Sequence, residues 1–155
     1  MTLADIIDAR TVLPNLHAQS KKQLLQELSE AAAPMLSVDA RLIFETLRRR
    51  EKLGSTGLGQ GIAIPHGKLA GLSRVYGLFA RLAAPVAFDS IDGQPVDLVF
   101  LLMAPEHAGA DHLKALARIS RLLRDSATVS KLRGAEDAAA LYAILTEPTV
   151  SASAA

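Results

Sequence analysis

The chain has 155 residues, of which 50% are hydrophobic and 21% charged, and its formal net charge is +1. This composition predicts one globular domain with a substantial core. A net charge so close to zero argues against a nucleic-acid surface. The sequence has no cysteine, which excludes disulfides, thiolate metal sites and a cysteine nucleophile.

The N-terminus carries an early acid, Asp5, and has no basic region before an apolar run, so we expect no signal peptide. The longest apolar stretch, Val96–Ala104, contains Asp97 and is far too short to span a bilayer. We therefore expect a soluble, cytoplasmic protein with no membrane insertion.

The first predicted elements lie in residues 1–16, which favour a short helix and then a strand-like piece closed by Pro14. Ser20 and Gln23 have the spacing of a capping box and predict the start of a helix. Because proline lacks an N–H, Pro34 is expected to end that helix.

A second helix is predicted after Ser37, which can cap it, with Asp39 in its first turn. The helix finishes in the basic run Arg48–Arg50, interpreted as a solvated helix end rather than a nucleic-acid patch, and Gly54 suits its C-terminal cap. Its apolar positions recur at helical spacing and predict a buried stripe of Leu42, Ile43 and Leu47.

The character of the chain then changes to apolar runs separated by Gly, Pro, Asp and Ser. These runs predict strands at Leu58–Ile64, Val75–Leu82, Val86–Phe88 and Val96–Met103. Asp92-Gly93 marks the turn before the last of them. That last strand is nearly all apolar, so we expect it to be covered on both faces.

A strong amphipathic helix is predicted from about residue 111 to 124, followed by a helical turn at Val129–Leu132 and a last helix at Glu136–Leu145. The inward stripe predicted for the first of these is Leu113, Leu116, Ile119, Leu122 and Leu123. Helices on either side of a block of strands predict an α/β (α+β) sandwich with a mixed β-sheet flanked by helices on both faces. We expect a single domain over 1–146 and a flexible tail over 147–155.

The most distinctive stretch is Gly61-Ile-Ala-Ile-Pro-His-Gly-Lys68. In an extended segment, the alternating glycines at 57, 59 and 61 would leave one face open. Pro65 restricts its own φ and the residue before it, which gives His66 a stiff base. Gly67 then permits a sharp turn. This pattern predicts that the imidazole of His66 is presented and not buried.

The sequence contains three histidines besides His66. His17 and His107 lie in polar loops and are expected to be solvated. His112 falls on the apolar stripe of its helix, which favours a partly buried structural role. It also lies at a helix N-terminus, where free N–H groups and the dipole favour an anion and hold the pKa of a histidine down.

A neutral imidazole at His66 can act as a nucleophile toward phosphorus or as a general base. Small neighbours would give access, while hydroxyls, N–H groups and cations would bind phosphate oxygens. The phosphate-binding candidates are Ser55, Thr56, Gly67 and Lys68, with Arg50 or Lys68 balancing charge.

Two other site chemistries are less favoured. A zinc site would have to draw on His66, His107, His112 and Asp111, but the spacing of the last two histidines does not match a helical metal pair. The glycines at 57, 59 and 61 lack dinucleotide or P-loop spacing. We therefore expect no cofactor and no metal.

The site residues occur in blocks that are similar to one known family. The blocks are Arg50-Glu51, Gly54-Ser-Thr-Gly-Leu-Gly59, Gly61–Lys68, Pro105 and His112-Leu113. Together they resemble the enzyme IIA domain of the mannitol/fructose/nitrogen type of the bacterial phosphotransferase system, over roughly residues 3–145. The nitrogen-regulatory branch matches best, through the free-standing length, the Gly-Ser-Thr-Gly run and the segment 92–97.

The resemblance implies roles for three residues. His66 would be phosphorylated on Nε2 by the phosphohistidine of an HPr-like phosphocarrier protein, NPr. His112 would hydrogen-bond the phosphate without being phosphorylated, and Arg50 would stabilise its charge. The implied fold is a mixed β-sheet with helices on both sides.

The resemblance also implies partners. The regulatory targets would be proteins such as potassium-transport proteins or sensor kinases. The chain shows no IIB or IIC domain, which favours regulation over sugar transport. The alternatives are an enzyme IIA component for fructose- or mannitol-type uptake and a non-catalytic binding module with the same fold. An apolar rim is the expected docking surface for the carrier: Leu58, Ile62, Ile64 and Leu69.

Overall fold

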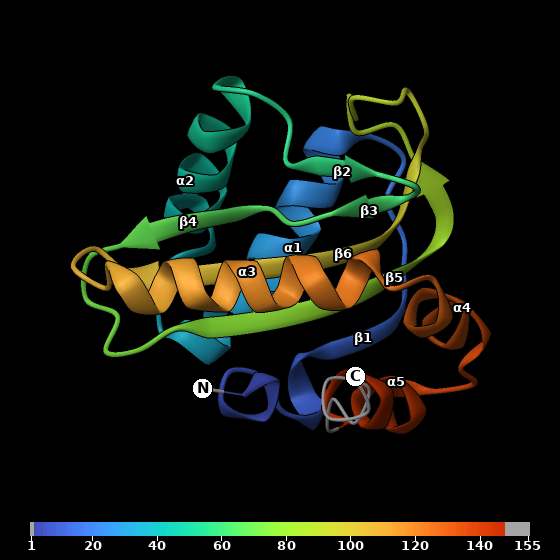
Figure 1. The fold of residues 1–155 in the computed structure, drawn as a ribbon. Helices are drawn as coiled ribbons and strands as arrows, with labels where there is room; N and C mark the ends of the chain where they lie inside the picture. Colours follow the sequence, from blue (N-terminus) through green and yellow to red (C-terminus); the bar gives the residue numbers. More distant parts are fainter. Residues whose placement is uncertain (1, 148–155) are drawn as a thin grey trace.

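The computed structural model describes residues 2–147, which form one six-stranded sheet with helices on both faces (Figure 1). The strands are β1 (Val12–Leu16), β2 (Gly57–Gly59), β3 (Ile62–Ala63), β4 (His66–Leu69), β5 (Tyr76–Val86) and β6 (Val96–Pro105). The helices are α1 (Lys21–Leu36), α2 (Ala40–Lys52), α3 (Ala110–Arg124), α4 (Ser126–Gly134) and α5 (Ala138–Leu145), with 3₁₀ turns at Leu3–Asp5 and Ala9–Thr11. The predicted fold class is confirmed.

The sheet is mixed, with strand order β1-β5-β6-β3-β2, and β4 pairs with β6 beyond β3. β5 runs antiparallel to β6, whereas β1 is parallel to β5, and both β3 and β4 are parallel to β6. β3 and β4 therefore lie end to end along one edge of β6. This arrangement puts His66 opposite Leu102, near the carboxyl end of the central strand.

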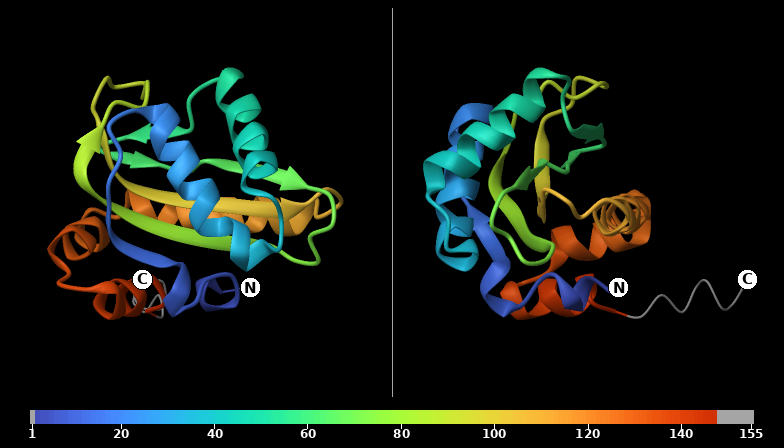
Figure 2. Two further views of the ribbon diagram at one scale, coloured as in Figure 1. Left: turned by 180° about the vertical axis from the view of Figure 1, so that it is seen from behind. Right: turned by 90° about the vertical axis from the view of Figure 1, so that its left-hand side faces the viewer.

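β6 separates two hydrophobic cores, because successive side chains of a strand point to opposite faces. Phe100 and Leu102 belong to the core beneath α3, α4 and α5, while Val99 and Leu101 belong to the core beneath α1 and α2. Figure 2 shows the two helical layers on either side of the sheet. The prediction that this strand is covered on both faces is confirmed.

The N-terminal prediction needs correction. The first segment forms two 3₁₀ turns, and Pro14 lies inside β1 instead of closing it. β1 is an edge strand with an irregular register between Leu13 and Leu16, which is where a sheet tolerates a residue without an N–H. The carbonyl of Pro14 accepts a bond of 3.1 Å from Arg81 Nε.

The α1–α2 boundary also differs from the prediction. Pro34 lies within α1, which continues to Leu36. A proline this close to the C-terminus costs one backbone bond, and Ser37 then ends the helix with φ 55° and a backbone N–H donated to Ala33 O. The N-cap of α2 is Asp39, whose side chain accepts from the N–H of Arg41. Ser37 is therefore a C-cap, and Asp39 precedes the first turn.

Other caps and turns match the sequence pattern. Ser20 Oγ accepts the N–H of Gln23 at 3.1 Å, while the Gln23 side chain accepts from Gln19 N rather than completing the reciprocal bond of a capping box. The C-cap of α2 is Leu53, and Gly54 follows it with φ 146°. The turn before β6 forms with Gly93 at φ 72°.

Two residues predicted to be buried are exposed. Leu42 on α2 is 51% exposed and Leu113 on α3 is 64% exposed, whereas the other predicted stripe residues are buried or half-buried. Both lie at the margin of an amphipathic helical stripe, where a 3.6-residue repeat does not decide which flank meets the sheet. Each exposed leucine is flanked along the chain by a buried residue, Ile43 and His112 respectively.

The segment predicted as one strand from Leu58 to Ile64 is a tight hairpin. β2 and β3 are joined through Gln60, which has φ 57°, between Gly59 at φ 92° and Gly61 at φ 85°. The alternating glycines therefore do not form one open face of an extended strand. Of the three, Gly59 and Gly61 supply the positive φ angles that the turn requires.

Three further predicted boundaries change. β5 continues to Val86 with a register irregularity, so no separate strand forms at Val86–Phe88. The predicted turn at Val129–Leu132 is the middle of α4, and α5 begins after Asp137, whose side chain caps it. The predicted tail over 147–155 lies outside the described residues apart from Glu147.

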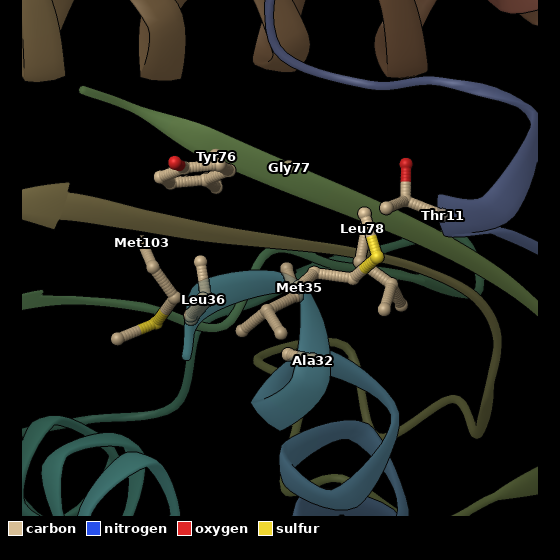
Figure 3. A pocket seen from close by; sticks show the side chains of 9 residues that line it. Thr11, Ala32, Met35, Leu36, Tyr76, Gly77, Leu78 and Met103 are labelled. Atoms are coloured by element: carbon tan, nitrogen blue, oxygen red, sulfur yellow. The ribbon is translucent and has the colours of Figure 1, made fainter. Parts of the chain in front are cut away.

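A cavity of about 10 Å³ lies between the end of α1 and strands β5 and β6. Figure 3 shows the side chains that line it. Its lining is almost wholly apolar and includes Met35, Tyr76, Leu78 and Met103. A gap this small with no converging polar groups is a packing defect and not a ligand site. In the described part of the chain, no helix combines the length and apolar character needed to cross a bilayer.

Candidate functional site

His66 begins β4 and is half-buried. Its Nδ1 lies 2.8 Å from the carbonyl oxygen of Ile64. Because a carbonyl oxygen can only accept, Nδ1 must carry the proton, and the lone pair of the neutral ring is then on Nε2. Pro65, directly before His66, is held by β6, since its carbonyl accepts the N–H of Leu102 at 3.0 Å.

The prediction that Gly67 turns the chain away from His66 is wrong. Gly67 is the second residue of β4 and pairs with Met103, and the chain turns later, at Gly71 with φ 88°. Residues alternate across a strand, so His66 and Lys68 face one side of β4 while Gly67 faces the other. On that other side, Gly67 packs against Thr46 of α2.

His112 is brought to His66 by α3. The two ring centroids are 5.6 Å apart with an interplanar angle of 47°. His112 is only 7% exposed, on the same helical stripe as Ile119 and Leu123, as its spacing predicts. Its Nδ1 is buried without a hydrogen-bond partner among the described residues. An unpaired acceptor is commoner than an unpaired N–H, so the favoured neutral tautomer carries its proton on Nε2.

Burial is the main cause that lowers the pKa of both rings. For His66 the nearby Arg50 lowers the pKa further, against opposing contributions from the Ile64 bond and Glu51. The pKa of His112 is lowered by burial and then by the positive charges that His66 and Lys68 can carry. Both imidazoles are therefore neutral at pH 7, which is the state that a nucleophilic ring nitrogen requires.

This pair gives a testable dependence of stability on pH. A base whose pKa is lower in the folded than in the unfolded state makes the protein less stable as pH falls below the unfolded value of 6.5. We expect the free energy of unfolding to drop on acidification through that range. In the double variant His66→Ala/His112→Ala the drop should be smaller, and in the control His17→Ala unchanged, as measured by urea unfolding. Equal slopes in all three proteins would contradict the burial effect.

Arg50 lies in the last turn of α2, where its Nη1 donates to the carbonyl of Gly54 at 2.9 Å. It is partly exposed and acts on the His66 ring through its charge. Lys68 is exposed and acts in the same way on His112. The structure thus gathers His66, His112, Arg50 and Lys68 into one electropositive site.

Ser55 and Thr56 have their hydroxyls engaged within the protein. Ser55 Oγ donates to Phe88 O at 2.7 Å and accepts the N–H of Gly57 at 3.0 Å. Thr56 is buried and its hydroxyl donates to Glu51. These contacts order the loop before β2. For Ser55 and Thr56 to bind phosphate as predicted, both hydroxyl groups would have to stop donating to their present acceptors.

The remaining histidines do not join this pair. His107 is exposed and lines an open cleft of about 360 Å³ together with Asp5, Arg74 and Asp111. His17 is exposed before α1. Across residues 2–147, no group of three or more His, Asp or Glu side chains is arranged to hold a metal ion.

The predicted apolar rim also needs correction. Ile62, Ile64 and Leu69 are at most 3% exposed, because they face the two cores, and only Leu58 reaches the surface, at 37%. Two other apolar residues lie at the surface: Leu53, three residues after Arg50 and 85% exposed, which the helical pattern did not single out, and Leu113, next to His112, which that pattern placed on a buried stripe.

Sequence reasoning also missed one site neighbour, Glu51. Its side chain is only 6% exposed and forms an ion pair with Lys21. The sequence shows it as one charge in a charged helix end, with no sign of burial. In the sequence, only its position next to Arg50 in the Arg50-Glu51 block indicated that Glu51 lies near the site.

The fold and the site together define a class of small α/β proteins in which a mixed sheet holds two histidines side by side. The chain belongs to the enzyme IIA type 2 family: the model described as "Phosphoenolpyruvate-dependent sugar phosphotransferase system, EIIA 2" matches residues 5–147.

Relatives agree with this assignment. The chain is 56% identical over 152 residues to a nitrogen regulatory protein of Bradyrhizobium diazoefficiens, covering 98% of this chain and 99% of the relative. It is 42% identical to a nitrogen regulatory protein of Escherichia coli, covering 95% and 91%. The crystal structure of the nitrogen regulatory protein IIA-Ntr from Neisseria meningitidis superposes with a TM-score of 0.89 at 38% identity, covering 93% and 99%. The predicted resemblance to the nitrogen-regulatory branch is confirmed.

Proposed function

We propose that this chain is a phosphocarrier that accepts a phosphoryl group on Nε2 of His66 from an HPr-like phosphocarrier protein, NPr. The observation that carries the proposal is the bond from His66 Nδ1 to the Ile64 carbonyl, at 2.8 Å. It leaves Nε2 as the free nucleophilic nitrogen of a neutral ring, next to a second neutral imidazole.

The transfer is a displacement between two imidazoles. The lone pair of His66 Nε2 forms a new bond to phosphorus as the bond from phosphorus to the carrier's ring nitrogen breaks, and that electron pair returns to the carrier's imidazole. The proton on His66 Nδ1 stays in place throughout, held by Ile64 O. Catalysis therefore consists of positioning and charge stabilisation.

The transferred group carries negative charge on three oxygens. In this proposal His112 donates from Nε2–H to one of them, and Arg50 and Lys68 offset the charge. Gly67 remains a predicted phosphate-binding position, through its backbone. Ser55 and Thr56 remain predicted donors as well, at the cost of the contacts they now make.

The regulatory half of the proposal rests on the relatives named nitrogen regulatory protein. Partner proteins, such as potassium-transport proteins or sensor kinases, would distinguish the phosphorylated from the unphosphorylated form. We place these events in the cytoplasm, where the carrier would act. An enzyme IIA role in fructose or mannitol uptake is less favoured, because the relatives of highest identity among those compared carry the regulatory name. A binding module without transfer would leave the free Nε2 unused.

The first test locates the phosphoryl group. Incubation with the phosphorylated carrier should add an acid-labile, base-stable phosphate to one residue. Peptide mapping should place it on His66, and the ³¹P–¹⁵N couplings of ring-labelled protein should place it on Nε2. Phosphate on His112, or on Nδ1 of His66, would overturn the assignment.

The second test addresses regulation. Unphosphorylated protein and the charge mimic His66→Asp are used as baits under matched conditions, with His107→Asp as the control for an added surface charge. We expect partners that distinguish the His66 variant from the unphosphorylated form, with the control behaving like wild type. Identical partner sets for all three baits would favour the binding module.

A further inference from the structure

The buried carboxylate of Glu51 lies near His66 on α2, which covers the face of the sheet opposite to α3 and His112. Glu51 in the last turn of α2 is only 6% exposed, and its Oε1 lies 3.0 Å from Lys21 Nζ at the start of α1. Lys21 also lies 4.5 Å from the centroid of the Phe88 ring and 3.7 Å from Asp89. A carboxylate is rarely buried without a partner, and this ion pair connects two helices at one end of the sheet.

The same carboxylate holds the loop between α2 and β2, which passes the start of α1 (Figure 1). The backbone N–H of Thr56 donates to Glu51 Oε1 at 3.1 Å, and the Thr56 hydroxyl donates to Oε2. Both oxygens of Glu51 are therefore occupied by Thr56, with Lys21 sharing one of them. These contacts fix the backbone of Thr56 from its N-terminal side.

Thr56 in turn fixes the residue on which His66 depends. The N–H of Ile64 donates to the Thr56 carbonyl at 3.1 Å, and the Ile64 carbonyl accepts from His66 Nδ1 at 2.8 Å. A continuous chain of contacts thus runs from Lys21 and Glu51 through Thr56 and Ile64 to His66. On the other side, β6 holds Pro65 through its own strand bond.

We propose that Glu51 is a positioning residue for His66: its buried carboxylate fixes Thr56, and through Thr56 it fixes the Ile64 carbonyl that selects the Nδ1–H tautomer. The inference rests on the proposed function, because the selected tautomer matters as the one that leaves Nε2 free to accept phosphorus. The negative charge of Glu51 acts in the same direction as the Ile64 bond, since both oppose the lowering of the pKa of His66.

Glu51→Gln tests this role. The amide has one acceptor oxygen, so with its NH₂ toward the Thr56 hydroxyl that hydroxyl must turn to accept instead of donate, and the charge that pairs with Lys21 is lost. The contacts that fix Thr56 are therefore weakened. We expect the ¹⁵N shifts of the His66 ring to show a smaller Nδ1–H fraction and the pKa of His66 to fall. The rate of phosphoryl acceptance should fall by up to about 10²-fold, the cost of misplacing a reacting atom by about 1 Å.

Two further variants separate positioning from stability. Loss of one member of a buried ion pair destabilises a protein, so Lys21→Met/Glu51→Gln removes both charges and should fold while keeping the smaller Nδ1–H fraction. Thr56→Val removes only the hydroxyl contact and should give an intermediate fraction. The matched control is Glu45→Gln, on the same helix, where the carboxylate pairs with Arg48 at 2.9 Å and is 42% exposed. It should leave the His66 tautomer and the rate unchanged.

The outcomes are distinguishable. Apart from Glu51, the charged and titratable groups around His66 are Arg50 of α2, Lys68 of β4 and His112 of α3, and they are the same in every variant. If Glu51→Gln lowers the melting temperature while the tautomer, the pKa of His66 and the rate match wild type, Glu51 is only structural and the inference is overturned. If the wild-type protein takes no phosphate on His66, the proposed function fails, and the tautomer comparison still decides whether Glu51 positions the ring.

Discussion

His66→Ala is expected to abolish phosphoryl acceptance, whereas His112→Ala is expected to slow it by about 10²–10³-fold. The first change removes the Nε2 lone pair that attacks phosphorus, and the other unpaired ring nitrogen among the described site residues, His112 Nδ1, is buried. The second removes a single donor to the transferred group, and Arg50 and Lys68 remain to stabilise its charge. Rates are measured by single-turnover transfer from the phosphorylated carrier.

The controls for this pair of variants follow from burial. The His66 ring is half-buried, so its loss should leave the fold intact, and the near-ultraviolet spectrum and unfolding curve should stay close to wild type. His112 is buried, so His112→Gln, which fills the site and retains an N–H donor, should recover part of the rate. The exposed His107→Ala should react like wild type. Label on His66→Ala but not on His112→Ala would reverse the two roles.

The fold class was predictable because its main signals are local. The apolar run of β6 between helical segments indicates a covered central strand, and the two cores on its faces account for its composition. The cap at Ser20 is a side-chain contact with the nearest helix turn, which neighbouring residues largely decide.

The hairpin that precedes the site was not predictable from the same signals. Gly57, Gly59 and Gly61 have the two-residue spacing of a strand, but the chain turns at Gln60 with a positive φ. The turn is fixed by a distant residue, since Asp92 accepts the N–H of Gln60 at 2.8 Å. A contact between residues this far apart in the sequence cannot be predicted from a local pattern.

For the site itself, residue types could be predicted but their arrangement could not. His66, His112 and Arg50 stand out by motif and spacing, and the resemblance gave them roles. The tautomer of His66 depends on the local backbone conformation that turns the Ile64 carbonyl, two residues away, toward Nδ1, and the burial of Glu51 depends on Lys21, which tertiary structure brings from another helix. Ser55 and Thr56 look like free hydroxyls in sequence because their acceptors, Phe88 O and Glu51, are not apparent from the motif.

Gly67→Ala is expected to destabilise the protein by about 1–3 kcal/mol, the usual cost of overpacking a closely packed position. The φ of Gly67 lies outside the left-handed region, so the backbone itself accepts alanine. The obstacle is steric: a Cβ at this position would lie 2.6 Å from Thr46 Cγ2 and 3.6 Å from Met103 Cε. Relief requires α2 or β4 to shift, and β4 carries His66, so acceptance of phosphate should slow as well.

A compensating change isolates the cause. Thr46→Ser removes Cγ2 and retains the hydroxyl that donates to Leu42 O at 2.8 Å. Gly67→Ala/Thr46→Ser should therefore recover most of the stability lost by Gly67→Ala, and the coupling energy of the double-mutant cycle should be favourable. Recovery of the phosphoryl transfer rate in the same protein would show that the glycine serves the site by letting α2 approach β4. A double variant as unstable as Gly67→Ala would mean that the strain arises elsewhere than at Thr46.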